Sequence, residues 1–302
     1  MANRHYAEIG DVWKHLPLAV ILEREPVGEF WESHSGSATY PFDPGEARDY
    51  GARRVLSRAA DAPAMDRSAY VRLLREHDAA GRYPGSPALA MALAPAARFH
   101  FCDTEPASLA GIRAEAARLG LDPARVMTHA GDGISTLAAE LRVASDERAH
   151  GVLAHLDPYR PLQPGVDGTN TVELFWRLAA RGARAVLWYG FDTMTGRDEL
   201  LAAIAGSDVT SRDTPLWCGE MFPTFLLHAG RAPSSSFPGC GILCANLGPA
   251  TVLACREAGE ALASLYRRAT VGDEPAELTL MTSDFVPGPG HGRVRSGDPG
   301  GA

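Results

Sequence analysis

Residues that could bind a ligand follow four apolar runs of this 302-residue sequence, at the point where each run ends. A polar ligand needs acids, hydroxyls, imidazoles and a backbone that it can approach closely. The four groups are His34-Ser35-Gly36 after residues 28–33, Asp103 after 97–102, Asp132-Gly133 after 124–131, and Asp157-Pro158-Tyr159 after 151–156. The last group is either part of an active site or the end of a strand in a proline turn.

The order of these groups is typical of a site for an adenosyl compound. The acid at the end of the second run, Asp103, suits the hydroxyl groups of a ribose, and Asp132 before a glycine suits an adenine amino group. Small residues around Gly36 let a ligand approach the backbone. Because the sequence has no GxGxxG pattern after the first run, this order favours S-adenosylmethionine over NAD.

Predicted strands and helices alternate around these groups. This alternation predicts an α/β fold with a mostly parallel sheet, whose strands bring ligand-binding residues to their carboxyl ends. The predicted fold class is the Rossmann-like fold of class I methyltransferases that use S-adenosylmethionine. The predicted strands are 28–33, 97–103, 124–133, 151–157, 184–190, 214–222, 241–247 and 276–285, and the main helices are 11–24, 107–120, 134–141, 171–181, 197–205 and 250–267.

We predict one methyltransferase domain over residues 1–286 and a disordered Gly/Pro-rich tail over 287–302. The first helix of the predicted domain begins with Asp11 as the N-cap. Helices predicted between the first two strands form a small inserted subdomain, about residues 41–85, expected to lie over the carboxyl edge of the sheet. "RYPGSP", residues 82–87, is expected to be a turn before another helix.

Composition excludes several classes of function. No run of eighteen apolar residues is present, so we expect no membrane span. Five cysteines without a CxxC pair argue against a disulfide framework or a metal site and favour a cytoplasmic protein. A formal net charge of -8 weakens the case for a nucleic-acid substrate, although "GARRVLSR", residues 51–58, is either a nucleic-acid patch or a solvated helix face.

Lys14 is the only lysine, and the other 28 of the 29 basic residues are arginines. A composition that replaces lysine so widely suggests that this one is retained where a compact ammonium group is required. The alternative is chance.

Several motifs together resemble the RlmJ-type methyltransferases of large-subunit ribosomal RNA, which modify the exocyclic amine of an adenine. "RHYAEIGDVWKH" is similar to the family's "RH…GNxADVxKH" box and places Lys14 and His15 on its Lys-His pair. "ESHSGSATY" resembles "DTHAGAGxY" and places His34, with Ser35 and Gly36 in its loop, while "YPGSP" is the same in both and places Ser86.

The remaining motifs extend the resemblance over most of the chain. "CDTEP" resembles "ELHP" at Asp103, "GDG" resembles "DG" at Asp132 and Gly133, and "LDPY" resembles "IDPPY" at Asp157. The resemblance implies that these residues bind S-adenosylmethionine. It further implies that Asp157 and the Pro158 carbonyl accept hydrogen bonds from the target amine, that Tyr159 stacks on the target, and that Lys14 belongs to the catalytic group.

The departures from the family pattern lie mainly on the acceptor side. The family's Asp-Pro-Pro-Tyr has become Asp157-Pro158-Tyr159-Arg160, and its second double-proline segment has become "NLGP", which begins at Asn246. A shift of about 1 Å in such groups can cost about a hundredfold in rate. We therefore expect a methyltransferase with a small-molecule or other non-adenine amine as acceptor, acting as a monomer or homodimer. The alternatives are methylation of a ribosomal RNA adenine and a degenerate protein that only binds the cofactor.

Overall fold

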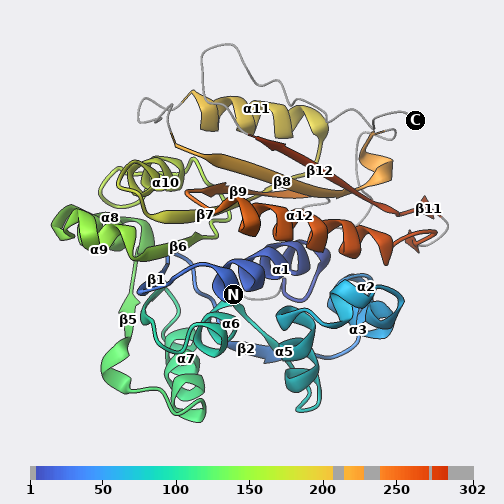
Figure 1. Cartoon of the computed structure of the whole chain (residues 1–302), viewed down its shortest axis with the longest axis horizontal. Coiled ribbons are helices and arrows are strands. Elements are labelled where there is room, and N and C mark those ends of the chain that lie inside the picture. Colours follow the sequence, from blue (N-terminus) through green and yellow to red (C-terminus); the bar gives the residue numbers. More distant parts are fainter. Residues whose placement is uncertain (1–4, 207–213, 228–238, 272–273, 285–302) are drawn as a thin grey trace.

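A single eight-stranded sheet forms the centre of the protein, in a computed structural model that describes residues 5–206, 214–227, 239–271 and 274–284 (Figure 1). The order of its strands is β12-β8-β9-β7-β6-β1-β4-β5. Its strands are β1 (Glu29–Glu32), β4 (Arg98–Asp103), β5 (Val126–Ala130), β6 (Val152–Leu156), β7 (Arg184–Phe191), β8 (Leu216–Pro223), β9 (Gly239–Ala245) and β12 (Leu278–Asp284). Two short antiparallel pairs lie outside this sheet: β2 (Thr39–Pro41) with β3 (Arg82–Pro84), and β10 (Thr270–Val271) with β11 (Glu274–Pro275).

The strands that precede the predicted ligand groups are neighbours. Five neighbouring strands are parallel to one another: β5, β4, β1, β6 and β7. The other three are antiparallel to their neighbours, with β9 paired to β7, β8 to β9, and β12 to β8. The chain proceeds from β1 to β4 and β5 on one side, then returns to β6 on the other side of β1. Such a reversal leaves a crevice at the carboxyl ends of the strands on either side of it, here β1 and β6. The predicted mostly parallel α/β sheet is thereby confirmed.

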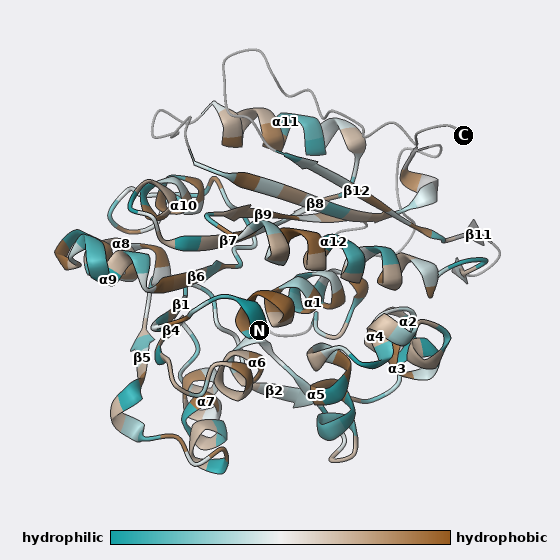
Figure 2. Ribbon diagram, in the orientation of Figure 1, coloured by the Kyte–Doolittle hydropathy of each residue, from teal (hydrophilic) through white to brown (hydrophobic). Residues whose placement is uncertain are grey.

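Helices cover both faces of the sheet and form two hydrophobic cores. One core joins the sheet to α1, α5, α6, α7 and α12, and the other joins it to α8, α9, α10 and α11. Figure 2 shows hydrophobic residues along α1 and the strands, and hydrophilic residues on the outer turns of α5 and α9. The helices are α1 (Ile9–Arg24), α2 (Glu46–Tyr50), α3 (Ala52–Arg58), α4 (Pro63–Asp66), α5 (Ala69–Asp78), α6 (Ser86–Leu93), α7 (Pro106–Arg118), α8 (Gly133–Val143), α9 (Asp146–His150), α10 (Thr171–Ala180), α11 (Met194–Ala205) and α12 (Pro249–Ser264), with 3-10 turns η1 (Ala59–Asp61), η2 (Pro123–Arg125) and η3 (Thr224–Leu227).

Two local predictions were wrong. Helix α1 begins at Ile9 with Glu8 as its N-cap, so Asp11 is the third helical residue and its carboxylate accepts from the Glu8 backbone N–H at 3.3 Å. An acid can stabilise a helix from its first turn as well as from the cap, which the sequence alone did not distinguish. Residues 82–84 form strand β3 rather than a turn, because they pair with residues 39–41.

The segment between β1 and β4 contains α2, α3, η1, α4, α5 and α6. The helices α2 to α5 pack near α1 and α12, on one side of the sheet (Figure 1). Only the two ends of the predicted insertion, near Tyr40 and from Tyr83 to Ser86, reach the crevice described below. The predicted tail at 287–302 lies outside the described residues.

The five cysteines are buried and unpaired. No helix among the described residues is long and apolar enough to span a membrane. Within the same residues, no group of three or more His, Cys, Asp or Glu side chains is arranged to hold a metal ion.

Candidate functional site

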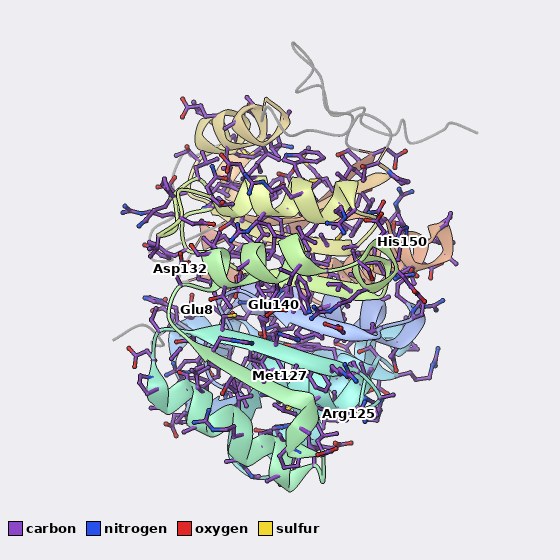
Figure 3. All side chains as sticks on the ribbon, turned by 90° about the vertical axis from the view of Figure 1, so that its left-hand side faces the viewer. Glu8, Arg125, Met127, Asp132, Glu140 and His150 are labelled. Carbon is purple, nitrogen blue, oxygen red and sulfur yellow. The ribbon has the colours of Figure 1, made fainter. Side chains whose placement is uncertain are left out.

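A cavity of about 510 Å³ lies at the carboxyl ends of β1, β4, β5 and β6. In Figure 3, Asp132 at the carboxyl end of β5 and Glu8 before α1 lie on the same side of the view, opposite Arg125 at the start of β5. Each residue predicted to catalyse or to bind the cofactor lines this cavity: Lys14, His15, His34, Ser35, Gly36, Ser86, Asp103, Asp132, Gly133, Asp157, Pro158 and Tyr159. The structure brings the predicted residues together, while their individual roles remain predictions.

The loop after β1 is tied to the end of β4. The Ser35 hydroxyl donates to the carbonyl of Cys102 at 3.0 Å, and the Gly36 N–H donates to Asp103 Oδ2 at 2.8 Å. Gly36 has a φ of 60°, a conformation that glycine adopts without strain. Asp103 Oδ1 also accepts from the Glu105 N–H at 2.7 Å. The carboxylate of Asp103 is thus fixed in the wall of the cavity, with one acceptor position of each oxygen still available to a ligand.

The start of α8 packs directly against the same loop. A Cβ atom on Gly133 would lie 1.9 Å from the carbonyl oxygen of Ser33, so only glycine fits there. Asp132 is the N-cap of α8, and its Oδ1 accepts from the Ile134 N–H at 3.0 Å. Burial by itself raises the pKa of Asp132, but hydrogen bonds from Ser135 and from the Val166 and Ile134 backbone outweigh it and lower that pKa.

An ion cluster closes the other end of the cavity. Lys14 Nζ lies 2.7 Å from Asp157 Oδ2 and 3.0 Å from Asp11 Oδ1, and it stands 5.6 Å from the centre of the Trp188 ring. Burial lowers the pKa of Lys14, but the two carboxylates outweigh it and raise that pKa, so the ammonium stays charged. The only lysine therefore links helix α1 to the Asp157-Pro158-Tyr159 turn, which is distant from α1 in sequence.

Two histidines of the cavity wall, His15 and His34, are neutral near pH 7. His15 Nδ1 lies 2.8 Å from the Tyr83 hydroxyl, and burial with the nearby Lys14 charge lowers the pKa of His15 well below its usual value. His34 Nδ1 lies 2.8 Å from the Ser33 hydroxyl. Burial also lowers the pKa of His34, against the opposing effect of three surrounding carboxylates, of which Asp157 has the largest.

A buried acid–histidine pair lies beneath this wall, and sequence reasoning missed it. Glu32 of β1 and His155 of β6 are opposite each other in the sheet and are 0% exposed, with Glu32 Oε1 2.6 Å from His155 Nδ1. Burial raises the pKa of Glu32 well above its usual value and lowers the pKa of His155 to about 4. Both directions favour a neutral pair that shares one proton. The polar residues available in the sequence were Glu32, the last residue of β1, and His155 inside the apolar run of β6.

Several other lining residues were also missed. Tyr6 and Tyr40 stack with their ring centres 4.8 Å apart, and burial raises the pKa of Tyr40 to about 12. Gln163 to Val166 form a wall near Asp132. Arg160, which the sequence had already singled out in the altered Asp-Pro-Tyr-Arg motif, also lines the cavity and stands over the Tyr159 ring at 5.9 Å. Tyr40 lies in β2 and the others lie in loops, and all of these positions depend on contacts distant in sequence.

Ser86 and Asn246, two residues of the family-like motifs, differ in their position relative to the cavity. Ser86 is the first residue of α6 and does not cap it, since the N-cap is Gly85. Asn246 does not line the cavity; its side-chain amide instead donates to the carbonyls of Ala179 and Ala183 at 2.9 and 2.8 Å.

No known family model matches the chain, and no curated protein matches it in sequence. Among solved structures, protein LPL1258 from Legionella pneumophila, described by the family model DUF519, is 18% identical with a TM-score of 0.68, and the match covers 93% of this chain and 98% of that one. The S-adenosylmethionine-dependent methyltransferase from Agrobacterium tumefaciens is 12% identical with a TM-score of 0.39, over 78% of this chain and 61% of that one. A precorrin-6y C5,15-methyltransferase from Geobacter metallireducens is 13% identical with a TM-score of 0.33, over 76% and 85%.

The Legionella likeness extends over nearly the whole of both chains and, at this identity, shows the fold alone. With the strand order and the central parallel strands, the chain has a Rossmann-like α/β fold with a mostly parallel central sheet. The predicted fold class is confirmed.

Proposed function

We propose that this protein is an S-adenosylmethionine-dependent methyltransferase, a divergent relative of the RlmJ-type family, that acts on a small molecule with an amine acceptor. The observation that carries the proposal is the convergence of all twelve predicted residues, from four strand ends and two helices, on one cavity. Parallel neighbouring strands already bring their carboxyl ends to one edge, so the arrival of Lys14 and His15 from α1 and of Ser86 from α6 at the same cavity adds the stronger support.

The chemistry of the cavity suits the cofactor. Asp103 retains acceptor capacity for ribose hydroxyls. Because Gly133 has no side chain, the backbone at the start of α8 packs against the loop after β1, and together they form the floor of the cavity. Ile134 and the backbone near Gly165 line the end next to Asp132, where a flat apolar base would pack. Of the described lining residues, the aspartates Asp11, Asp103, Asp132 and Asp157 outnumber the two permanent cations, Lys14 and Arg160, which favours a cationic sulfonium ligand.

Bound there, S-adenosylmethionine would supply an electrophilic methyl group. The chain's own task is then to position an acceptor lone pair and to exclude water. Asp157 Oδ2 is fixed by the ammonium of Lys14, so its remaining acceptor positions and the Pro158 carbonyl could hold the N–H groups of an amine. A neutral amine needs no strong base before it attacks. His34 lines the same cavity in its neutral form and could take the proton that leaves afterwards.

The charges of the cavity support a small amine over a nucleic acid. A phosphate chain that entered the cavity would meet its lining aspartates, and each such contact opposes binding. One observation favours the alternative, methylation of a ribosomal RNA adenine: Tyr159 is 67% exposed at the rim, where a base could stack.

Calorimetric titration with S-adenosylmethionine tests the cofactor. We expect micromolar binding to the wild type and a loss of about 10- to 100-fold in Asp103→Ala, because charged hydrogen bonds to the ribose are removed. The control is Asp78→Ala, which removes an exposed acid that does not line the cavity. Absence of binding to the wild type would contradict the proposal.

Methyl transfer from labelled cofactor then separates the acceptors. Transfer to small amines and not to unmodified ribosomal RNA supports the proposal, and the reverse result supports the RNA alternative. Tight cofactor binding without transfer to either acceptor would support the third possibility, a protein that binds the cofactor and does not catalyse.

A further inference from the structure

The loop over residues 158–168, which joins β6 to α10, forms a wall of the cavity along much of its length. Tyr159 and Arg160 lie toward the acceptor end, and Gln163 to Val166 lie toward Asp132. Three of its hydrophobic side chains are solvent-exposed, with Val166 at 89%. A loop that buries so little apolar surface needs another source of order.

Asp132 and Ser135 of α8 supply that order. Asp132 Oδ2 accepts from the Val166 N–H at 2.7 Å and from the Ser135 hydroxyl at 2.5 Å. The Ser135 hydroxyl also accepts from the Asp167 N–H at 3.1 Å and lies 3.0 Å from Asp167 Oδ1. The hydroxyl proton is thus shared between two carboxylates while the oxygen binds the loop backbone.

The contact is also close in space. A Cβ atom on Gly165 would lie 2.4 Å from Asp132 Oδ2 and 3.1 Å from Ser135 Oγ, so the loop backbone rests directly on these two side chains. Asp167 is held in turn by the Thr169 N–H at 3.0 Å. Hydrogen bonds from this N–H, Ser135 and Arg142 lower the pKa of Asp167, which keeps the carboxylate charged.

We propose that Asp132 and Ser135 act as positioning residues for the acceptor end of the site, by holding the 158–168 loop so that Tyr159 and Arg160 face the cavity. The carboxylate predicted to bind the adenine is already engaged by the chain itself: Oδ2 accepts from the Ser135 hydroxyl and the Val166 N–H, and Oδ1 accepts from the Ile134 N–H. One side chain therefore serves the cofactor end and the acceptor loop together. Ser135 does not line the cavity and acts only through the loop. The effect on catalysis rests on the proposed function, whereas the holding of the loop does not.

Hydrogen–deuterium exchange of the ligand-free, full-length protein tests the proposal. Ser135→Ala removes the hydroxyl, and Gly165→Ala forces the loop away from α8 without changing a charge. We expect both variants to speed exchange by about tenfold or more at the Val166 and Asp167 amides and also at the Gln163 amide, which bonds to the Arg160 carbonyl at 3.1 Å.

Two variants serve as controls. Ser135→Thr keeps the hydroxyl and should restore slow exchange. Thr136→Ala removes a neighbouring hydroxyl that donates to the Asp132 carbonyl instead of to the loop, so exchange in the loop should stay slow. Exchange that is unchanged in Ser135→Ala, or faster only at Val166 and Asp167, would overturn the proposal, since Asp132 and Ser135 would then not position the acceptor-facing residues.

Titration of the same proteins with S-adenosylhomocysteine keeps the two proposals separate. If the wild type does not bind this compound, the proposed function fails, while the exchange result still decides whether the loop is held. If the wild type binds it and exchange is unaffected by the variants, the proposed function stands and the positioning role fails.

Discussion

At the scale of single residues, Lys14 connects two carboxylates of the site. Its ammonium pairs with Asp157 and Asp11, whose side chains are 15% and 17% exposed. Lys14→Met would leave both carboxylates close together without a cation, and we expect the free energy of unfolding to fall by about 3 kcal/mol. Lys14→Arg keeps the charge and should lose less stability, but its planar fork should misplace Asp157 and lower methyl transfer.

Urea unfolding at pH 7 measures these effects. The matched control is Arg58→Met, which breaks an ion pair with Asp61 whose two side chains are 44% and 56% exposed, and which should cost at most about 1 kcal/mol. Equal losses in Lys14→Met and Arg58→Met would show that the Lys14 cluster contributes no more than a surface pair.

The buried Glu32–His155 pair predicts a pH dependence of stability. Burial raises the pKa of Glu32, so the folded protein keeps a proton that the unfolded chain releases above its ordinary pKa of 4.5. This group's contribution to stability is therefore greatest below pH 4.5 and is lost as the pH rises. Glu32→Gln removes the titration and keeps a hydrogen-bond donor for His155. Relative to the wild type, its free energy of unfolding should increase by up to about 1.4 kcal/mol per pH unit above pH 4.5.

Chemical unfolding of both proteins between pH 5 and 8 checks this expectation. Glu115→Gln is the control, because hydrogen bonds from His77 and Arg118 outweigh burial and lower the pKa of Glu115 to about 2. Its contribution is present above pH 4.5 and is lost only as the pH falls toward 2, so the Glu115→Gln difference should be flat over this range. A flat Glu32→Gln difference would mean that Glu32 is ionised in the folded protein.

At the scale of elements, the packing of α8 on the β1 loop decides whether the cavity forms. Gly133→Ala would bring a Cβ atom to 1.9 Å from the Ser33 carbonyl oxygen, so α8 or the loop must move. We expect a loss of about 1–3 kcal/mol in the free energy of unfolding, with weaker cofactor binding. Gly111→Ala is the control: Gly111 lies inside α7 with no atom within 4 Å of the added Cβ, and the change should stabilise by about 0.5–1 kcal/mol.

Thermal unfolding and cofactor titration of both variants give the two readouts. If Gly133→Ala were as stable as the wild type and bound the cofactor as tightly, then the close packing of α8 on the β1 loop would not be needed for the cavity to form or to bind.

The elements that the sequence predicted well are those with a local signal. Each of the eight sheet strands was predicted, since apolar runs such as residues 152–156 are buried along their whole length. The carboxyl ends of β1, β4, β5 and β6 could be placed together because strand–helix alternation specifies parallel neighbours. The residues that follow these ends, such as Asp103, were found for that reason.

What the sequence did not predict depends on contacts between distant segments. Strands β2 and β3 have three residues each and exist only because they pair with each other. The Glu32–His155 pair requires the register between β1 and β6, which no local pattern specifies. The contact of the 158–168 loop with Asp132 likewise depends on where α8 begins relative to that loop.

At the scale of the whole molecule, charge bears on the choice of acceptor. The net charge is -8, and the Arg-rich helix α3 that could have formed a nucleic-acid patch is engaged within the protein. Arg53 pairs with Asp49 at 3.0 Å, Arg54 donates to the Leu265 carbonyl at 3.1 Å, and Arg58 pairs with Asp61 at 2.7 Å. These contacts favour the interpretation of residues 51–58 as an ordinary helix face.

We therefore expect weak binding to ribosomal RNA. In a filter-binding assay at 0.15 M salt, a transcript of large-subunit ribosomal RNA should bind with a Kd weaker than about 10 µM, within the range of non-specific contacts. Binding that is much tighter, that weakens steeply with salt, and that is lost in Arg53→Ala/Arg58→Ala would restore the RNA alternative. Each phosphate contacted by a basic side chain contributes about -0.7 to the slope of log K against log salt for a single strand, so a slope near zero marks a protein that does not grip the backbone. In that case the acceptor should be sought among small amines that fit beside Asp157.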